Sequence, residues 1–237
     1  MTDTHPWFSG PQGQHVLDSE RALMDAALAD LFGFVMVQLG DWGPRGALLG
    51  ARRTPQLVIA SPDAEAGAVR CDPAALPFAN ESVDVLVLPH TLEASRRPHD
   101  VMRECERVLV GEGHLVVLGF NPWSAWGARR RVGPQRFPFD FPNCIPEQRL
   151  GDWLALLGLE TLAAHRHLHG LPFESARAFR RGAFLERAGP RWWPQLAGGY
   201  VLTARKRRFG ATRLRVNDTR ARRVLGTAEP AVQRAAA

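Results

Sequence analysis

The chain has 237 residues, enough for one α/β domain with additions and a core that buries most of its apolar surface. Its hydrophobic fraction of 45% and charged fraction of 23% are ordinary for a globular protein. No apolar run approaches the roughly 20 residues that a bilayer-spanning helix needs. Residues 1–15 have neither the basic region nor the apolar core of a signal peptide. Cys71, Cys105 and Cys144 are scattered and form no CxxC pair. We therefore expect free thiols and a cytoplasmic protein.

The net charge of +6 is local rather than spread over the chain. From Arg205 onward there are ten Lys or Arg residues against Asp218 and Glu229, a net charge of +8. The preceding residues therefore carry about −2 in total. We predict a domain over residues 1–206, followed by a basic, disordered tail over residues 207–237.

The N-terminal half predicts a flexible arm and then the first elements of a sheet. Residues 1–15 are polar and contain Gly and Pro, so we expect the arm there. A helical apolar stripe follows and ends at Gly33. Buried strands are predicted at residues 34–39 and 56–60, and a short edge strand at residues 68–70.

Residues 71–121 contain the clearest structural pattern in the chain. Residues 83–88 and 114–120 are short β-branched runs without polar alternation, as expected for strands buried on both faces. Between them, the apolar residues from Val101 to Leu109 lie on one helical stripe that begins after Pro98. Strand, helix and strand at this spacing predict a right-handed βαβ unit with parallel strands.

The C-terminal half alternates irregular segments with further elements. Residues 123–145 are aromatic, Pro-rich and aperiodic, which predicts a lid or loop insertion. A helix is expected at 146–157, a strand at 159–168, an irregular and partly helical region at 172–195, and a last strand at 198–206.

Several short motifs in this order resemble the class I S-adenosylmethionine (SAM) dependent methyltransferases, in particular the type 11 methyltransferase domain family. The matching residues are Asp72, Leu76-Pro77-Phe78, Ser82-Val83-Asp84, Leu92-Glu93, Glu104, Arg107-Val108-Leu109, Gly111 and Gly113. The resemblance covers residues 13–206. It implies a Rossmann-like fold with a central, mostly parallel seven-stranded sheet, flanking helices and a final antiparallel strand.

In an open α/β sheet, ligands bind at the carboxyl ends of the strands, where the strand order reverses. The candidate cofactor-binding residues are therefore Gly40, Ser61, Asp72 and His90. The resemblance implies that Gly40 approaches the methionine half of SAM, Ser61 the ribose and Asp72 the adenine amino group. It implies that His90 lines the methionine end.

The chain departs from the family pattern at three of these strand ends. Gln38 stands where the family has an acid, and the glycines after it are widely spaced with Trp42 between them. Ser61 replaces an acid that binds ribose. Pro73 follows Asp72 and has no N–H to offer the adenine ring.

Three functions remain open from the sequence. The first is SAM-dependent methylation of a small or lipid-like acceptor, with no catalytic residue assigned. The second is a catalytically inactive methyltransferase fold that serves as a binding or regulatory protein. The third, RNA methylation, rests on the basic tail.

The basic tail admits nucleic acid or an anionic membrane surface as a partner, or no partner at all. Arg129–Arg131 with Trp123 and Trp126 would assist at a membrane. His165, His167 and His169 would share one strand face, but no further ligand completes a metal site. We therefore expect no metal.

Overall fold

The computed structural model describes residues 6–62, 69–132, 141–172 and 176–208. Its centre is a seven-stranded sheet in the order β3-β2-β1-β4-β5-β7-β6. The strands are β1 (Val35–Leu39), β2 (Gln56–Ser61), β3 (Val69–Arg70), β4 (Val83–Pro89), β5 (Leu109–Phe120), β6 (Leu159–His167) and β7 (Gly199–Lys206). Strands β1 to β5 are parallel, and β7 runs antiparallel to both β5 and β6.

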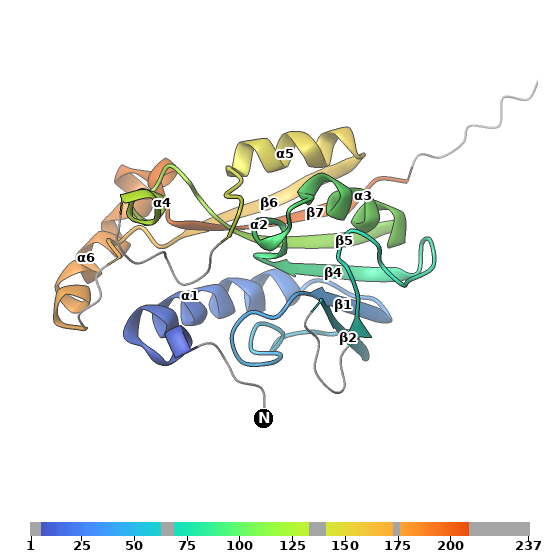
Figure 1. Cartoon of the computed structure of the whole chain (residues 1–237), viewed down its shortest axis with the longest axis horizontal. Coiled ribbons are helices and arrows are strands. Elements are labelled where there is room, and N and C mark those ends of the chain that lie inside the picture. Colours follow the sequence, from blue (N-terminus) through green and yellow to red (C-terminus); the bar gives the residue numbers. More distant parts are fainter. Residues whose placement is uncertain (1–5, 63–68, 133–140, 173–175, 209–237) are drawn as a thin grey trace, which may run out of the picture.

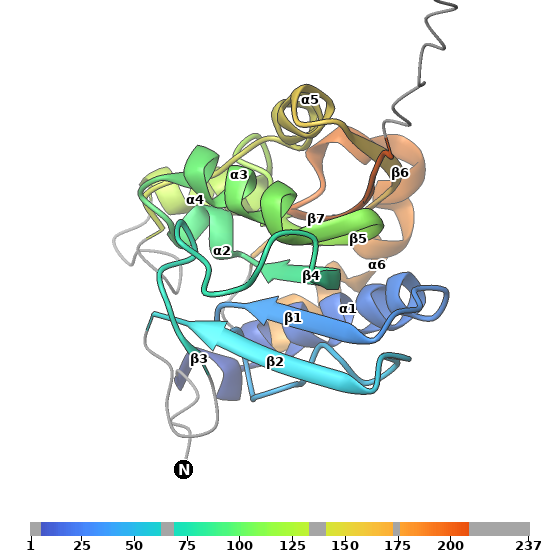
Figure 2. The same cartoon turned by 90° about the vertical axis from the view of Figure 1, so that its right-hand side faces the viewer.

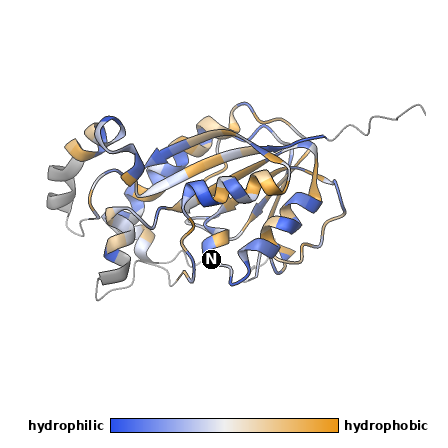
Figure 3. Cartoon of the chain, turned by 90° about the horizontal axis from the view of Figure 1, so that it is seen from above, coloured by the Kyte–Doolittle hydropathy of each residue, from blue (hydrophilic) through white to orange (hydrophobic). Residues whose placement is uncertain are grey.

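Helices cover both faces of the sheet (Figure 1, Figure 2). They are α1 (Pro11–Leu28), α2 (Thr91–Ala94), α3 (Pro98–Val108), α4 (Ala125–Val132), α5 (Glu147–Leu156) and α6 (Ala176–Trp192). There are two 3₁₀ turns: η1 (Pro6–Ser9) precedes α1, and η2 (Pro194–Leu196) follows α6. Helices α3 and α5 lie on one face of the sheet and α1 on the other (Figure 1). Hydrophobic and hydrophilic residues alternate along the helices (Figure 3).

Two apolar clusters result from this arrangement. One joins Val101 and Cys105 of α3 and Leu150 of α5 to strand residues such as Leu86 and Leu115. The other joins α1 to the opposite face of the same strands. Alternate side chains of a strand point to opposite faces, so residues 85–88 of β4 and 115–118 of β5 are all apolar and buried because both faces are covered.

The predicted sheet and its central βαβ unit are confirmed. The edge strand after residue 68 and the antiparallel last strand are also present. β5 begins at Leu109, directly after α3, which is earlier than the apolar run indicated. The domain limit at residue 206 and the tail stay predictions, since residues 209–237 lie outside the described part.

Two segments are more regular than the sequence indicated. Within the predicted arm at 1–15, the chain is helical from Pro6 because Phe8 is buried and packs edge-on against Trp42, with ring centroids 5.0 Å apart. Within the predicted loop at 123–145, residues 125–132 form α4. Ser124 caps this helix, since its hydroxyl accepts a bond from the Gly127 amide at 3.1 Å.

The connection between β1 and β2 is unusual for a parallel pair because no helix forms in it. Residues 40–55 cross between the strands as turns and coil, whereas such crossovers are usually helical. Gly40, Gly43 and Gly46 all have positive φ values, of 92°, 70° and 72°. The repeated left-handed conformation explains why these positions are glycine and why the segment does not continue as a helix.

Candidate functional site

A cavity of about 550 Å³ lies at the carboxyl ends of β1, β2 and β4. It therefore opens beside β1 and β4, between which the strand order reverses. The residues that line it come from the turn after β1, from the ends of β2 and β3, and from the segment after β4, and one, Phe141, comes from the segment before α5. They are Gly40, Asp41, Trp42, Ser61, Pro62, Asp72, Pro73, Pro89, His90, Thr91, Ala94, Ser95, Arg96, Arg97 and Phe141.

The glycine turn is held closely against the neighbouring strands. The Gly40 amide donates to the Ala60 carbonyl at 2.7 Å, and the Gln38 side-chain amide donates to the Gly40 carbonyl at 2.9 Å. A Cβ at position 40 would lie 3.2 Å from the Thr91 hydroxyl, and the φ of +92° is strained for any other residue. The turn thus places bare backbone at the cavity wall, with Gln38 bracing the turn in place of the family's acid.

Ser61 and Asp72 supply polar groups on the β2 and β3 side of the cavity. Ser61 is buried at the end of β2. One carboxylate oxygen of Asp72 accepts from the Ala74 amide at 2.9 Å, and the other accepts from Arg97 at 2.7 Å. The Asp72 side chain is half exposed. Because each carboxylate oxygen can accept more than one hydrogen bond, Asp72 can still take a further donor.

His90 lies at the centre of a buried network that joins four segments of the chain. Its Nδ1 is 2.5 Å from Glu93 Oε2, and its Nε2 is 2.9 Å from Glu20 Oε1 on α1. The second oxygen of Glu93 accepts from the Phe120 amide at 2.6 Å, and that of Glu20 accepts from the Trp42 indole at 2.6 Å. The network therefore fixes the glycine turn, α1 and the ends of β4 and β5 relative to one another.

The charges in this network explain the protonation of His90. Burial by itself would lower the pKa of His90, but the charges of Glu20 and Glu93 and hydrogen bonds to both raise it to about 9. Burial raises the pKa of Glu93 above its ordinary value, against the opposing effect of His90. An imidazolium donates from both ring nitrogens, which matches two carboxylate acceptors.

This geometry assigns His90 a structural part in the site. The side chain is only 1% exposed, and both of its nitrogens are held by carboxylates. A general base must reach its proton with a free nitrogen, and His90 has none. Its backbone is in the left-handed region, with φ of 55°, where it begins α2. His90 thus forms part of the wall and positions Trp42 and Glu93.

Aromatic rings surround His90 on the side of the glycine turn. The centroid of the His90 imidazole lies 4.1 Å from that of the Trp42 ring and 4.3 Å from that of the Phe120 ring. The centroids of the Phe141 and Trp42 rings are 6.0 Å apart. Trp42 lies between the widely spaced glycines Gly40 and Gly43. The indole fills space beside the turn, so this part of the site is apolar and closely packed.

The four predicted site residues, Gly40, Ser61, Asp72 and His90, all line the same cavity. Their roles toward a cofactor stay predictions. Sequence reasoning did not assign Asp41, Thr91, Arg96, Arg97 or Phe141 to the site. The sequence could have indicated the first four. Asp41 and Thr91 directly follow residues at predicted strand ends, and Arg96 and Arg97 lie within seven residues of His90. Phe141 had no such signal, since it arrives from a distant segment.

The three alternating histidines do not form a common surface group. His165 is exposed, whereas His167 and His169 are buried, and His169 lies beyond the end of β6. Burial lowers the pKa of His167 to about 4, so its imidazole is neutral at pH 7. Among the described residues, no three His, Cys, Asp or Glu side chains gather as metal ligands would.

The sheet order and the cavity at its switch point define a class I methyltransferase fold. Residues 33–117 match the family model described as "Methyltransferase domain". SAM is the cofactor of this domain family, as the resemblance implied. The matched residues span β1 to β4 and most of β5, so the part of the sheet that carries the cavity is the part similar to this family.

Individual proteins are similar to this chain in sequence or in fold. The chain is 44% identical over 106 residues to the uncharacterized protein YafS of Escherichia coli strain K12, a match that spans 44% of each chain. In fold it is similar to a Thermotoga maritima protein described as a SAM-dependent methyltransferase, "possible histamine N-methyltransferase", with 15% identity, a TM-score of 0.62 and coverage of 85% and 93%. It is also similar to geranyl diphosphate C-methyltransferase of Streptomyces coelicolor, with 18% identity, a TM-score of 0.55 and coverage of 82% and 80%.

Proposed function

We propose that this protein is a SAM-dependent methyltransferase that binds the donor in the cavity at the carboxyl ends of β1, β2 and β4. The observation that carries the proposal is the meeting of Gly40, Ser61, Asp72 and His90 around one cavity of about 550 Å³. Volumes of about 300–1,000 Å³ are typical of cofactor sites. When bound, SAM supplies an electrophilic methyl group on a sulfonium.

The chemistry of the lining residues suits a ligand that carries charges of both signs. Asp41 and Asp72 are acids, and Arg96 and Arg97 are bases, all at the same cavity. SAM has a carboxylate, an ammonium and a sulfonium, so each kind of group can find a partner. We assign the ribose hydroxyls to Ser61 and the adenine amino group to Asp72. With Pro73 lacking an N–H, Asp72 is the main polar contact for the adenine.

The acceptor in this proposal is a small or lipid-like molecule. Aromatic side chains at Trp42 and Phe141 form an apolar part of the lining. Methyl transfer from a sulfonium needs in-line positioning and exclusion of water more than it needs a base. The lack of a free basic nitrogen on His90 is therefore compatible with the reaction.

A second candidate function is a binding or regulatory protein on the same fold. It is favoured by Gln38 and Ser61, which stand where the family pattern has acids, and by the wide spacing of Gly40, Gly43 and Gly46. A buried carboxylate that accepts a hydrogen bond contributes roughly 1.5–3 kcal/mol. The loss of two such groups weakens any SAM-like binding and would suit a protein that has given up catalysis.

Calorimetric titration with SAM and S-adenosylhomocysteine tests the proposal. We expect micromolar binding, about −8 kcal/mol. Asp72→Asn should weaken it by about tenfold or more because the adenine amino group loses a charged acceptor. The matched control is Asp100→Asn, since Asp100 also pairs with Arg97 but does not line the cavity. If folded protein shows no binding heat at millimolar ligand, the binding or regulatory function would be favoured.

A further inference from the structure

Helix α6 presents a basic and aromatic outer face. Its sequence contains five arginines and a single acid, Glu186. Glu186 faces the body of the protein, where it accepts hydrogen bonds from the amides of His169 and Gly170, both at 2.9 Å. Phe184, Arg187 and Arg191 lie on the opposite side of the helix and are exposed. The acid is therefore withdrawn from the outer face, and Arg187 and Arg191 remain on it.

Large apolar side chains extend this face beyond the helix. Trp192 is 75% exposed, Phe184 70%, Trp123 65% and Leu196 52%. Leu196 is in η2, directly after α6, and it borders a cavity of about 280 Å³ together with Trp123. We call this set the α6 surface. It consists of Trp123, Phe184, Arg187, Arg191, Trp192 and Leu196.

The α6 surface lies at the same edge of the sheet as the donor cavity. α4 follows the carboxyl end of β5 and α6 follows that of β6, so both helices project from this edge, together at one end of the molecule (Figure 1). Arg129 of α4 donates to the Pro172 carbonyl, which ties α4 to the segment before α6. The sequence of α4, AWGARRRV, contains Arg129–Arg131 and no acidic residue.

We propose that the α6 surface docks the protein on an anionic lipid bilayer. Arginines near an anionic membrane are attracted to its surface potential, and Trp and Phe side chains insert at the level of the headgroups. A second copy of the chain would bring the same positive charges together, which is unfavourable. Single-stranded RNA prefers a basic groove, whereas α6 is a helix that projects at one end of the molecule (Figure 1).

This docking would be peripheral. Among the described residues, no helix is long and apolar enough to cross a membrane. Of the two tryptophans expected to assist at a membrane, Trp123 is exposed, but Trp126 is buried and donates to the Gly170 carbonyl at 2.9 Å. Membrane binding does not depend on methyl transfer, because an inactive protein would bind the membrane through the same side chains.

Vesicle co-sedimentation of the full chain tests the inference. The probes are vesicles of equal parts phosphatidylglycerol and phosphatidylcholine, and vesicles of phosphatidylcholine alone. We expect binding to the anionic vesicles that falls as salt is added. Arg187→Gln with Arg191→Gln should weaken it by about tenfold, and Phe184→Ser with Trp192→Ser should also weaken it.

Two matched controls make the outcome specific to the α6 surface. Phe34→Ser with Leu156→Ser removes two equally exposed apolar side chains elsewhere, and should leave binding unchanged. Arg222→Gln with Arg223→Gln removes the same charge from the C-terminal segment. Equal loss in this variant and in the α6 variants would overturn the proposal, as would full binding by the α6 variants. If RNA displaces the protein from the anionic vesicles when RNA and lipid supply equal negative charge, the α6 surface would be assigned to nucleic acid instead.

Discussion

The proton that His90 shares with two carboxylates makes the folded state sensitive to pH. The folded pKa of about 9 lies above the ordinary value of 6.5. The folded protein therefore binds this proton more tightly than the unfolded chain does. The resulting stabilisation is complete below pH 6.5 and is lost as the pH rises through 9.

We expect the free energy of unfolding to fall by about 3 kcal/mol between pH 6.5 and pH 9. Urea unfolding at a series of pH values, followed by circular dichroism, measures this fall. His90→Asn should flatten the profile. If that variant does not fold, Glu93→Gln serves instead, because it removes one of the charges that raise the His90 pKa. A flat profile in the unchanged protein would contradict the assignment.

Trp42 tests how far the aromatic packing supports the site. Trp42→Ala removes a buried ring and leaves Glu20 without its indole donor, so we expect a loss of about 3–5 kcal/mol in unfolding free energy. Trp42→Phe keeps most of the ring and should lose only about 1–3 kcal/mol. Trp123→Ala, at an exposed tryptophan, should stay within about 0.5 kcal/mol. Thermal or urea unfolding separates these expectations.

The residues at the strand ends were predictable, but their partners were not. Gly40, Ser61, Asp72 and His90 follow strands that are marked by apolar runs, so their common edge follows from the parallel sheet. Glu20 lies 70 residues before His90 on another element. No periodicity or motif indicates that pairing, because it depends on how α1 packs across the sheet.

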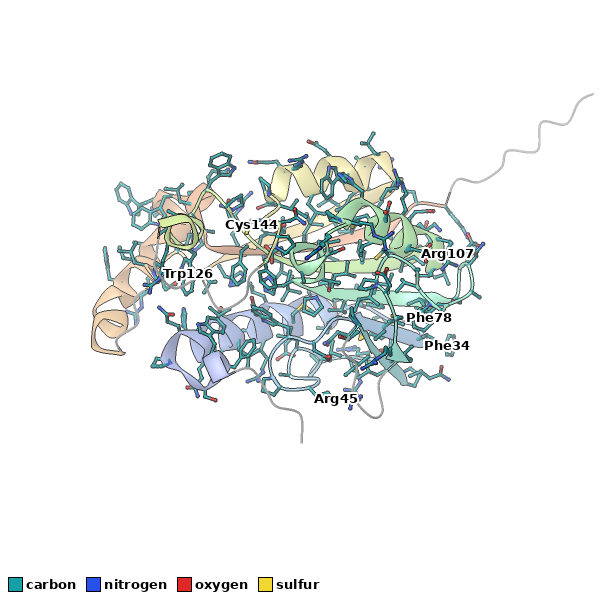
Figure 4. The ribbon with its side chains drawn as sticks, in the orientation of Figure 1. Phe34, Arg45, Phe78, Arg107, Trp126 and Cys144 are labelled. Atoms are coloured by element: carbon teal, nitrogen blue, oxygen red, sulfur yellow. The ribbon has the colours of Figure 1, made fainter. Side chains whose placement is uncertain are left out.

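At the scale of elements, Glu104 and Arg107 of the family motif bind the loop at residues 76–78. Arg107, at the end of α3, donates to the carbonyls of Leu76 and Phe78, both at 3.0 Å, and pairs with Glu104 (Figure 4). Glu104 in turn accepts from the Leu76 amide at 2.8 Å. These contacts attach the segment after Asp72 to α3, which fixes one wall of the cavity.

Removing this attachment should destabilise the protein. Arg107→Ala leaves the Leu76 and Phe78 carbonyls without this donor and removes the charged partner of Glu104, so we expect a loss of about 2 kcal/mol in unfolding free energy. The matched control is Arg103→Ala on the same helix, where an exposed pair with Asp100 contributes at most about 1 kcal/mol. Equal losses in urea unfolding would show that the contacts to residues 76–78 contribute nothing.

The strands and α3 were predictable because their apolar spacing reflects burial directly. α4 was not, because AWGARRRV has too few apolar residues to show a helical stripe and depends on the Ser124 cap. α6 was only partly indicated, since Pro190 lies inside it and its outer face is exposed. Both helices pack on the body through a few contacts, such as those of Trp126 and Glu186.

On the scale of the whole molecule, the carboxyl edge of the sheet carries both the donor cavity and the α6 surface. Docking through that surface would bring the cavity edge toward the bilayer, which suits a lipid-like acceptor. Arg208, the last described residue, follows β7 and donates its amide to Glu112 in the first part of β5, at the amino edge of the parallel strands. The partner of the basic tail stays a prediction.

The location of the donor is the central claim, and photochemical cross-linking of SAM tests it most directly. Protein irradiated with methyl-labelled SAM is digested, and the labelled peptides are mapped by mass spectrometry. We predict label within residues 40–42, 61–73 or 89–97, abolished by excess S-adenosylhomocysteine. Label confined to other segments, or label that the competitor does not displace, would contradict the assignment of the cavity as the SAM site.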